Sequence, residues 1–273
     1  MASEENLFEE TGRVLDLCSL DEKLEATEQL YKQWQQGEML QDSITSPKVI
    51  GQAGHPEKPE LVPPRKLKRR RLGTPMGHAS MLHAIAHIEF NAINLALDAV
   101  YRFREMPTEY YDDWLRIADE ERYHFQLVQG RLKQLGYDYG DFPAHNGLWE
   151  TAQQTADDVL LRMGLVPRIV EARGLDVNPG IMEKLREIGD EESQPILEVI
   201  LRDEVGHVKA GTVWFRYLCE QRGLDSEETF ESLVREKMSY AIRGPFYEPG
   251  RVEAGFSDRE MAFLQQLEQE NRA

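Results

Sequence analysis

Two short stretches decide the fold class: residues 119–124 read Asp-Glu-Glu-Arg-Tyr-His, and residues 202–207 read Arg-Asp-Glu-Val-Gly-His. Each contains a Glu-x-x-His pair preceded by an acidic residue, and the two pairs are Glu121 with His124 and Glu204 with His207. On an α-helix, residues i and i+3 share a face, so the carboxylate and the imidazole can bind the same ion. A single copy arises often by chance, but two copies in helical segments indicate a metal site.

The segments around the two motifs predict an all-α chain. Alternating runs of β-branched residues are missing, and most segments show helical spacing. We expect long helices at residues 79–104, 108–135, 148–173 and 194–221, and shorter ones at 19–36, 181–188, 226–241 and 257–271. Four long helices in succession, flanked by shorter ones, predict a four-helix bundle with extra N- and C-terminal helices.

Glycine, proline and capping residues set the expected helix ends. Pro107 separates the first two long helices, Gly136 ends the second, and Pro167 predicts a kink in the third. Residues 174–180 begin and end with glycine and are expected to form a loop. Two helices are expected to begin with capping boxes, formed by Ser19 with Glu22 and by Ser257 with Glu260.

Residues 37–78 differ in composition from the rest of the chain. They contain several prolines and glycines, which exclude a long helix and predict an extended arm that lies on the body of the protein. We therefore divide the chain into an N-terminal helix with this arm (1–78), a four-helix bundle (79–222) and a C-terminal helical extension (223–273).

The other two long helices each offer one carboxylate in an apolar stripe. Glu89 lies on the first long helix, and Glu171 lies on the third, near Pro167 and Val170. An unpaired charge is very costly to bury, so a glutamate at such a position is expected to have a cationic partner. These two glutamates complete a set of two carboxylates and two Glu-x-x-His pairs.

Sequence spacing supports this set. Glu89 and Glu121 are 32 residues apart, and the helix break at 105–107 lies midway between them. Two antiparallel helices that turn there place both glutamates at the same height. Each metal-bound histidine also needs an acceptor for its second ring nitrogen, and Glu120 and Asp203, each four residues before a histidine, are the candidates.

Two glutamates with two Glu-x-x-His pairs form the ligand set of the di-iron and di-manganese carboxylate bundles. The sequence resembles the ferritin-like superfamily, and it is similar to a bacterial ferritin-like family of unassigned function. The similar segments read Glu-Ala-Arg-Gly-Leu-Asp-Val at 171–177 and Arg-Asp-Glu-Val-Gly-His-Val at 202–208. The resemblance implies a di-metal centre and names no substrate. Its matching ligands are Glu89, Glu121, His124, Glu171, Glu204 and His207.

The donor types favour iron or manganese. Carboxylates and imidazoles suit these metals, and the two cysteines, Cys18 and Cys219, are far apart in sequence and form no Cys-x-x-Cys motif. We expect two metal ions, either an iron pair or a manganese–iron pair, with iron preferred. Beyond the metal centre, no catalytic residue is assigned.

Three classes of function remain open. The first is an oxidoreductase or hydroxylase that activates molecular oxygen, takes electrons from a donor and oxidises an unknown small molecule. The second is a ferroxidase or another iron-handling protein, and the third is an interaction bundle without metal. The extensions at both ends favour a shaped substrate site, and the third class leaves the glutamates in apolar stripes unexplained. Within the first class, the alternative substrate is tRNA.

Charge argues against nucleic acid as a general partner. The net charge of −17 repels polyanions on average. The basic run is an exception, and it consists of Arg65, Lys66, Lys68, Arg69, Arg70 and Arg71. This run can contact an acidic partner or RNA phosphates, or it can neutralise the acidic surface of the protein itself. We favour neutralisation, because no interleaved aromatic residues mark a base-stacking platform.

The sequence also predicts a cytoplasmic location without membrane association. No uninterrupted apolar stretch approaches the roughly 18 residues of a membrane span. The N-terminus is acidic and lacks the basic and apolar regions of a secretory signal. Two distant cysteines fit a reducing compartment.

Overall fold

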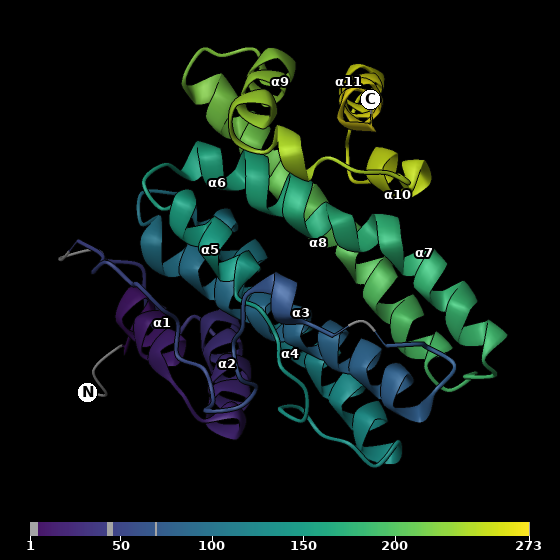
Figure 1. Cartoon of the computed structure of the whole chain (residues 1–273). Coiled ribbons are helices and arrows are strands. Elements are labelled where there is room, and N and C mark those ends of the chain that lie inside the picture. Colours follow the sequence, from purple (N-terminus) through teal and green to yellow (C-terminus); the bar gives the residue numbers. More distant parts are fainter. Residues whose placement is uncertain (1–4, 43–45, 69, 273) are drawn as a thin grey trace. The chain divides into compact units, whose positions relative to one another are not determined.

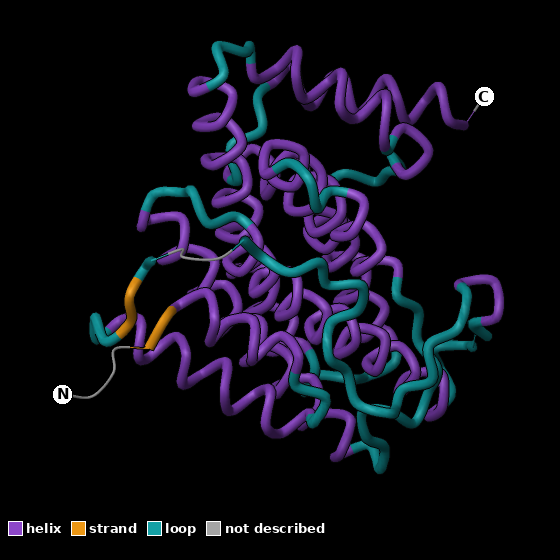
Figure 2. The backbone as a smooth tube through the Cα atoms, turned by 90° about the vertical axis from the view of Figure 1, so that its left-hand side faces the viewer, coloured by secondary structure: helices purple, strands orange, loops and turns teal. Residues whose placement is uncertain are grey.

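The computed structural model describes residues 5–42, 46–68 and 70–272. Helices dominate these residues, which confirms the all-α class, and two short strands, β1 (Glu5–Asn6) and β2 (Met39–Leu40), form a parallel pair (Figure 2, orange). The chain folds as two compact units, Met1–Gln154 and Thr155–Ala273. Figure 1 labels their helices.

Two long antiparallel helices, α3 (Pro75–Arg102) and α4 (Thr108–Gln134), form the centre of the first unit. The hydroxyl of Thr74 caps α3 by accepting a hydrogen bond from the N–H of Gly77 (3.1 Å), and Pro75 suits the first helical position. Shorter helices pack on this pair: α1 (Leu7–Asp16) on α3, α2 (Leu20–Gln35) on α4 and α5 (Gly147–Gln154) on α3.

The arm that precedes α3 packs against the helices of the first unit at Gly54, where Lys23 of α2 binds its backbone. A Cβ at Gly54 would lie 2.4 Å from the carbonyl oxygens of Asp16 and Leu17, so only glycine permits this close approach. Lys23 is fully buried on α2. Its Nζ donates to the carbonyls of Leu15 (3.0 Å) and Gly54 (2.7 Å), and to Oδ1 of Asn94 on α3 (2.6 Å). One buried ammonium therefore links α1, the arm and α3.

The second unit is organised around α8 (Gln194–Gln221). The segment before it consists of α6 (Val159–Leu165), the π-helical turn η2 (Val166–Glu171) and α7 (Ala172–Glu187), all of which contact α8. The C-terminal part contains α9 (Ser226–Lys237), η3 (Ser239–Ala241), α10 (Glu248–Glu253) and α11 (Asp258–Arg272). Of these, α9 and α10 contact α8, and α11 contacts α9.

The structure confirms several predicted helices and caps. The observed bounds of α2, α4 and α8 agree closely with the predicted ones. The N–H of Glu22 donates to the hydroxyl of Ser19 (3.4 Å). At α11 the predicted capping box is complete, because the Ser257 N–H donates to the Glu260 carboxylate (3.0 Å) and the Glu260 N–H donates to the Ser257 hydroxyl (3.2 Å).

The predicted loop at 174–180 is wrong, because α7 continues through it. Gly174, Pro179 and Gly180 disfavour a helix, but tertiary contacts hold this one in place. Asp176 forms a buried ion pair with Arg251 (2.8 Å), and Asn178 donates to the Leu197 carbonyl (3.3 Å). Contacts distant in sequence therefore outweigh the local preference.

Two other boundaries also differ from the prediction. The expected helix at 148–173 is interrupted at residues 155–158, where Asp158 caps α6 by accepting from the N–H of Leu160 (2.8 Å). The helix α1 was not predicted, although Asn6 caps it. The two compact units divide the chain inside the predicted bundle at 79–222, and the predicted domain boundaries stay a prediction.

Within the described ranges, no helix is both long and apolar enough to span a membrane. The cytoplasmic location stays a prediction.

Lys23 is expected to make the free energy of unfolding depend on pH. Burial lowers the pKa of Lys23 from its ordinary 10.5 to about 7. At pH values between these two pKa values, Lys23 is protonated in the unfolded chain and largely neutral in the folded one. Its contribution to stability therefore rises with pH, by at most about 1.4 kcal/mol per pH unit. In denaturant unfolding from about pH 6.5 to about pH 10, the wild type should gain stability relative to Lys23→Met.

Lys66→Met serves as the control, because Lys66 is exposed in the same unit. Its stability difference from the wild type should stay constant with pH. A constant difference for Lys23→Met as well would contradict a lowered pKa.

Candidate metal centre

Three predicted ligands meet inside the first unit. Glu89 on α3 and Glu121 and His124 on α4 each offer a ligand atom, and these atoms all lie within 4.8 Å of one another. His124 Nδ1 lies 3.4 Å from a Glu89 oxygen and 3.3 Å from a Glu121 oxygen. The turn before Pro107 brings α4 back along α3, so the expected common height of the two glutamates is confirmed.

The three side chains of this acidic group are shielded from solvent. Glu89, Glu121 and His124 are 5%, 2% and 0% exposed. Burial of this degree strengthens every charge interaction among the three groups.

Burial disfavours the charged form of Glu89. It raises the pKa of Glu89 well above the usual range, the neighbouring Glu121 carboxylate raises it further, and the hydrogen bond from His124 lowers it. Several other buried acids have arginine partners, as Asp98 has Arg102 (2.6 Å) and Asp176 has Arg251 (2.8 Å). Within the described part of the chain, Glu89 has no lysine or arginine partner. A divalent cation would supply the missing positive charge.

The second unit holds the other Glu-x-x-His pair. Glu204 and His207 are both buried on α8, and His207 Nδ1 lies 3.4 Å from a Glu204 oxygen. A Cβ at Gly174 would lie 3.6 Å from a Glu204 carboxylate oxygen, so the start of α7 lies against Glu204. Glu171 precedes Gly174 by three residues and therefore occupies the same helical face. It is half-buried, whereas the sequence predicted a buried carboxylate.

Glu171 is the last residue of the π-helical turn η2. This turn contains Pro167, where the sequence predicted a kink. π-helical turns are rare in proteins overall, and a large share of them lies at functional sites. Gly211 on α8 permits this turn to pack closely, because a Cβ there would lie 2.3 Å from Cγ of Pro167. The segment that carries Glu171 therefore has a defined position against α8.

Arg168 holds the same turn from the other side. It is fully buried, and its Nη2 lies 2.7 Å from the Glu260 carboxylate on α11. Its guanidinium also lies 4.1 to 4.9 Å from the ring centroids of Phe215, Phe230 and Phe256. No sequence pattern indicates this contact, because its members are 92 residues apart in the chain.

The two predicted outer acceptors make ion pairs with arginines. Glu120 accepts from Arg116 (2.7 Å), and Asp203 accepts from Arg202 (2.8 Å). Their role as acceptors for the histidines stays a prediction.

His83 and His87 on α3 were left out of the predicted ligand set, and both make hydrogen bonds within the protein. Burial lowers the pKa of each to about 4, so both are neutral at pH 7. His83 Nε2 accepts from the Gly140 N–H (2.9 Å). His87 Nε2 donates to the His145 carbonyl (3.0 Å), which leaves Nδ1 to accept from the Tyr139 hydroxyl (2.8 Å).

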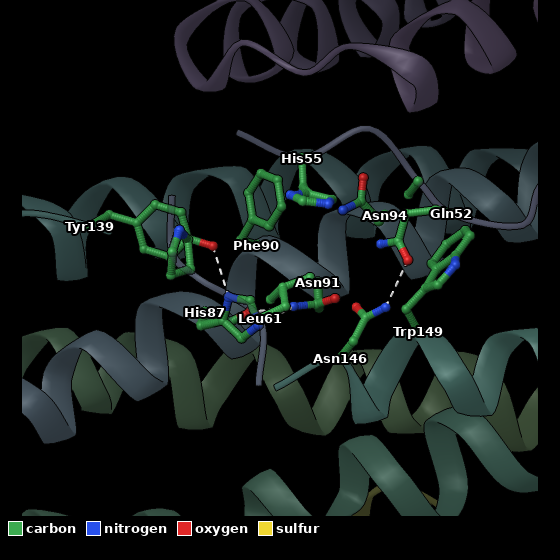
Figure 3. Close-up of a pocket in the computed structure, with 12 residues that line it drawn as sticks. Gln52, His55, Leu61, His87, Phe90, Asn91, Asn94, Tyr139, Asn146 and Trp149 are labelled. Atoms are coloured by element: carbon green, nitrogen blue, oxygen red, sulfur yellow. Dashed lines mark hydrogen bonds between the residues drawn. The ribbon is translucent and has the colours of Figure 1, made fainter. Parts of the chain in front are cut away.

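A small cavity adjoins His87 (Figure 3). Its volume of about 10 Å³ accommodates a single water molecule. Polar groups of Asn91, Asn94 and Asn146 line it together with the His87 ring and Trp149. No sequence pattern indicates this cavity, because residues 52–61 of the arm, which are distant in sequence from His87, close one side of it.

Comparisons with known proteins point to one family. The family model described as "Protein of unknown function (DUF455)" matches residues 17–262. A protein of Haemophilus influenzae, described as an uncharacterized protein, is 46% identical over 233 residues, which are 82% of this chain and 81% of that protein. No solved structure matches.

The raised pKa of Glu89 predicts how metal-free protein responds to pH. The folded state keeps the proton to higher pH than the unfolded chain, so the Glu89 contribution is present at low pH and lost as pH rises through the folded pKa. In metal-stripped protein, Glu89→Gln should therefore be more stable than the wild type, and its advantage should be larger at about pH 8 than at about pH 5.

Thermal unfolding in the presence of a chelator measures this difference. Glu183→Gln, an exposed change in the second unit, is the control and should show no such trend. A Glu89→Gln variant that is less stable than the wild type at both pH values would show that the charge of Glu89 does not destabilise the metal-free protein.

Proposed function

We propose that this chain, which belongs to the DUF455 family of proteins of unknown function, is an oxygen-activating oxidoreductase with a two-metal carboxylate centre. The observation that carries the proposal is the group formed by Glu89, Glu121 and His124. Three buried donor atoms lie within 4.8 Å of one another, and Glu89 has no lysine or arginine partner among the described residues.

The second half of the proposed centre is the group formed by Glu171, Glu204 and His207. Its assignment to the same centre rests on the repeated Glu-x-x-His pattern and on the ligand set of ferritin-like di-metal bundles. The ferritin-like four-helix arrangement is part of this proposal. Iron is the preferred metal, as an iron pair or with manganese, because all six donors are carboxylates or imidazoles.

The side chains have distinct roles in this proposal. When bound, the metal pair would supply oxygen activation at the expense of an external electron donor. The glutamates neutralise the metal charge and the histidines complete the ligand set. Burial shields Glu89 and His124 from water, and the Arg168 contact with Glu260 holds the turn that ends at Glu171.

Ferroxidase activity or iron handling is the alternative within the same chemistry. The two are distinguished by the fate of iron after exposure to oxygen. An oxidoreductase retains its ions and consumes oxygen with an electron donor, whereas an iron-handling protein oxidises repeated additions of ferrous iron and releases or stores the product.

Elemental analysis tests the metal centre. The wild type, loaded anaerobically with ferrous iron, should hold about two ions per chain. Glu121→Gln in the first unit and His207→Ala in the second should each lower the content of both ions if the two groups serve one centre. If each variant loses only about one ion, the groups bind metal independently.

Glu183→Gln is again the matched control, because this glutamate is exposed on α7 and should not alter metal content. A double variant of Glu121→Gln and His207→Ala that keeps the full metal content would refute the ligand assignment. A wild-type chain that binds no transition metal after anaerobic loading would refute the enzyme proposal itself.

A further inference from the structure

Five described cations of the arm form a basic segment before α3: Arg65, Lys66, Lys68, Arg70 and Arg71. Arg69, also part of the basic run in the sequence, lies outside the described residues. Four of the five are exposed, and Arg70 is half-buried. None of the five makes an ion pair with an acidic residue that the structure describes.

The absence of ion pairs is unexpected in a chain of net charge −17. Elsewhere in the same unit, arginines pair with acids, as Arg13 does with Glu10 (2.5 Å) and Arg116 with Glu120 (2.7 Å). If the basic segment served to neutralise the protein's own acidic surface, it would show pairs of this kind. The neutralising role favoured by the sequence analysis is therefore not supported by the contacts of these five side chains.

Local contacts hold the basic segment in position. Residues Pro64–Lys66 form a 3₁₀ turn, η1, and the Arg71 carbonyl accepts from the N–H of Thr74 (3.1 Å) at the start of α3. Arg70 donates to the Ser80 hydroxyl (3.2 Å), and its guanidinium lies 5.1 Å from the centroid of the Phe142 ring. The described part of the basic segment thus leads directly into the first turn of α3.

The chemistry of the basic segment fits a phosphate backbone better than an acidic protein. Protein interfaces have an apolar, well-packed core. Here Leu67 and Leu72 are half-buried, and Met76 is the exposed large apolar residue nearby. Binding to phosphates depends on clustered lysines and arginines, and arginine adds a planar fork that matches phosphate oxygens.

We propose that the basic segment binds the phosphate backbone of a nucleic acid. The contacts are to phosphates rather than bases, so binding depends on salt and has little sequence preference. The overall negative charge weakens long-range attraction and restricts contact to this segment. The proposal is independent of the metal centre, since none of the five cations is a candidate ligand.

Fluorescence anisotropy with labelled single-stranded RNA and DNA of equal length tests it, at salt concentrations from about 25 to about 250 mM. Binding should weaken steeply with salt. The triple variant Arg65→Ala, Lys66→Ala and Arg71→Ala should bind at least about 10-fold more weakly at low salt, and should lower the log–log salt slope by about 2. These three side chains are exposed and make no hydrogen bond within the described residues, so the variant should fold normally.

The control triple removes the same charge from the second unit: Lys184→Ala, Arg186→Ala and Arg202→Ala. It should bind within about twofold of the wild type, because phosphate contacts are local. Preference for RNA over DNA would assign RNA as the ligand, and equal binding would assign the backbone alone.

Three results would overturn the proposal. They are an absence of salt-dependent binding at low salt, equal losses in the two triple variants, and tighter binding of poly-glutamate than of either nucleic acid. The last result would identify an acidic protein as the partner.

Discussion

The cost of burying charge is the constraint on which the rest of this structure depends. Glu89 and Glu121 lie on facing helices, almost fully buried, with His124 between them. Burial raises the pKa of Glu89, and the neighbouring Glu121 carboxylate raises it further. The length of α3 and α4 and the turn at Pro107 serve to keep these groups at one height. A cation that binds both carboxylates would turn this unfavourable arrangement into a stabilising one.

Two buried acids of the second unit are neutralised by arginine instead. Arg168 and Arg251 neutralise the buried acids Glu260 and Asp176. The first pair links the C-terminal segment to η2, which ends at Glu171, and the second links it to α7, which follows. Buried pairs of this kind contribute little net stability, but removing one partner is strongly destabilising. We infer that their main effect is to fix geometry on both sides of Glu171. The C-terminal extension therefore acts as support for a candidate ligand.

The features that could be predicted from the sequence are those that depend on local patterns of residues. Helical spacing and capping residues predicted α2, α4, α8 and α11, and the 32-residue interval predicted the contact between Glu89 and Glu121. It did not reveal what depends on partners distant in the chain. The helix through residues 174–180 is stabilised by contacts with Arg251 and Leu197, which no local propensity anticipates. That the five cations of the basic segment lack acidic partners among the described residues could likewise be seen only from the positions of those acids.

Anomalous diffraction at the iron edge, from crystals of the anaerobically loaded protein, tests the central claim most directly. The account predicts an anomalous peak within coordination distance of the carboxylate oxygens of Glu89 and Glu121 and of the His124 ring, with a second peak bound by Glu204 and His207. A structure in which iron is absent from Glu89, Glu121 and His124 while the three side chains stay buried would contradict it. The buried carboxylates would then have to be explained by protonation alone.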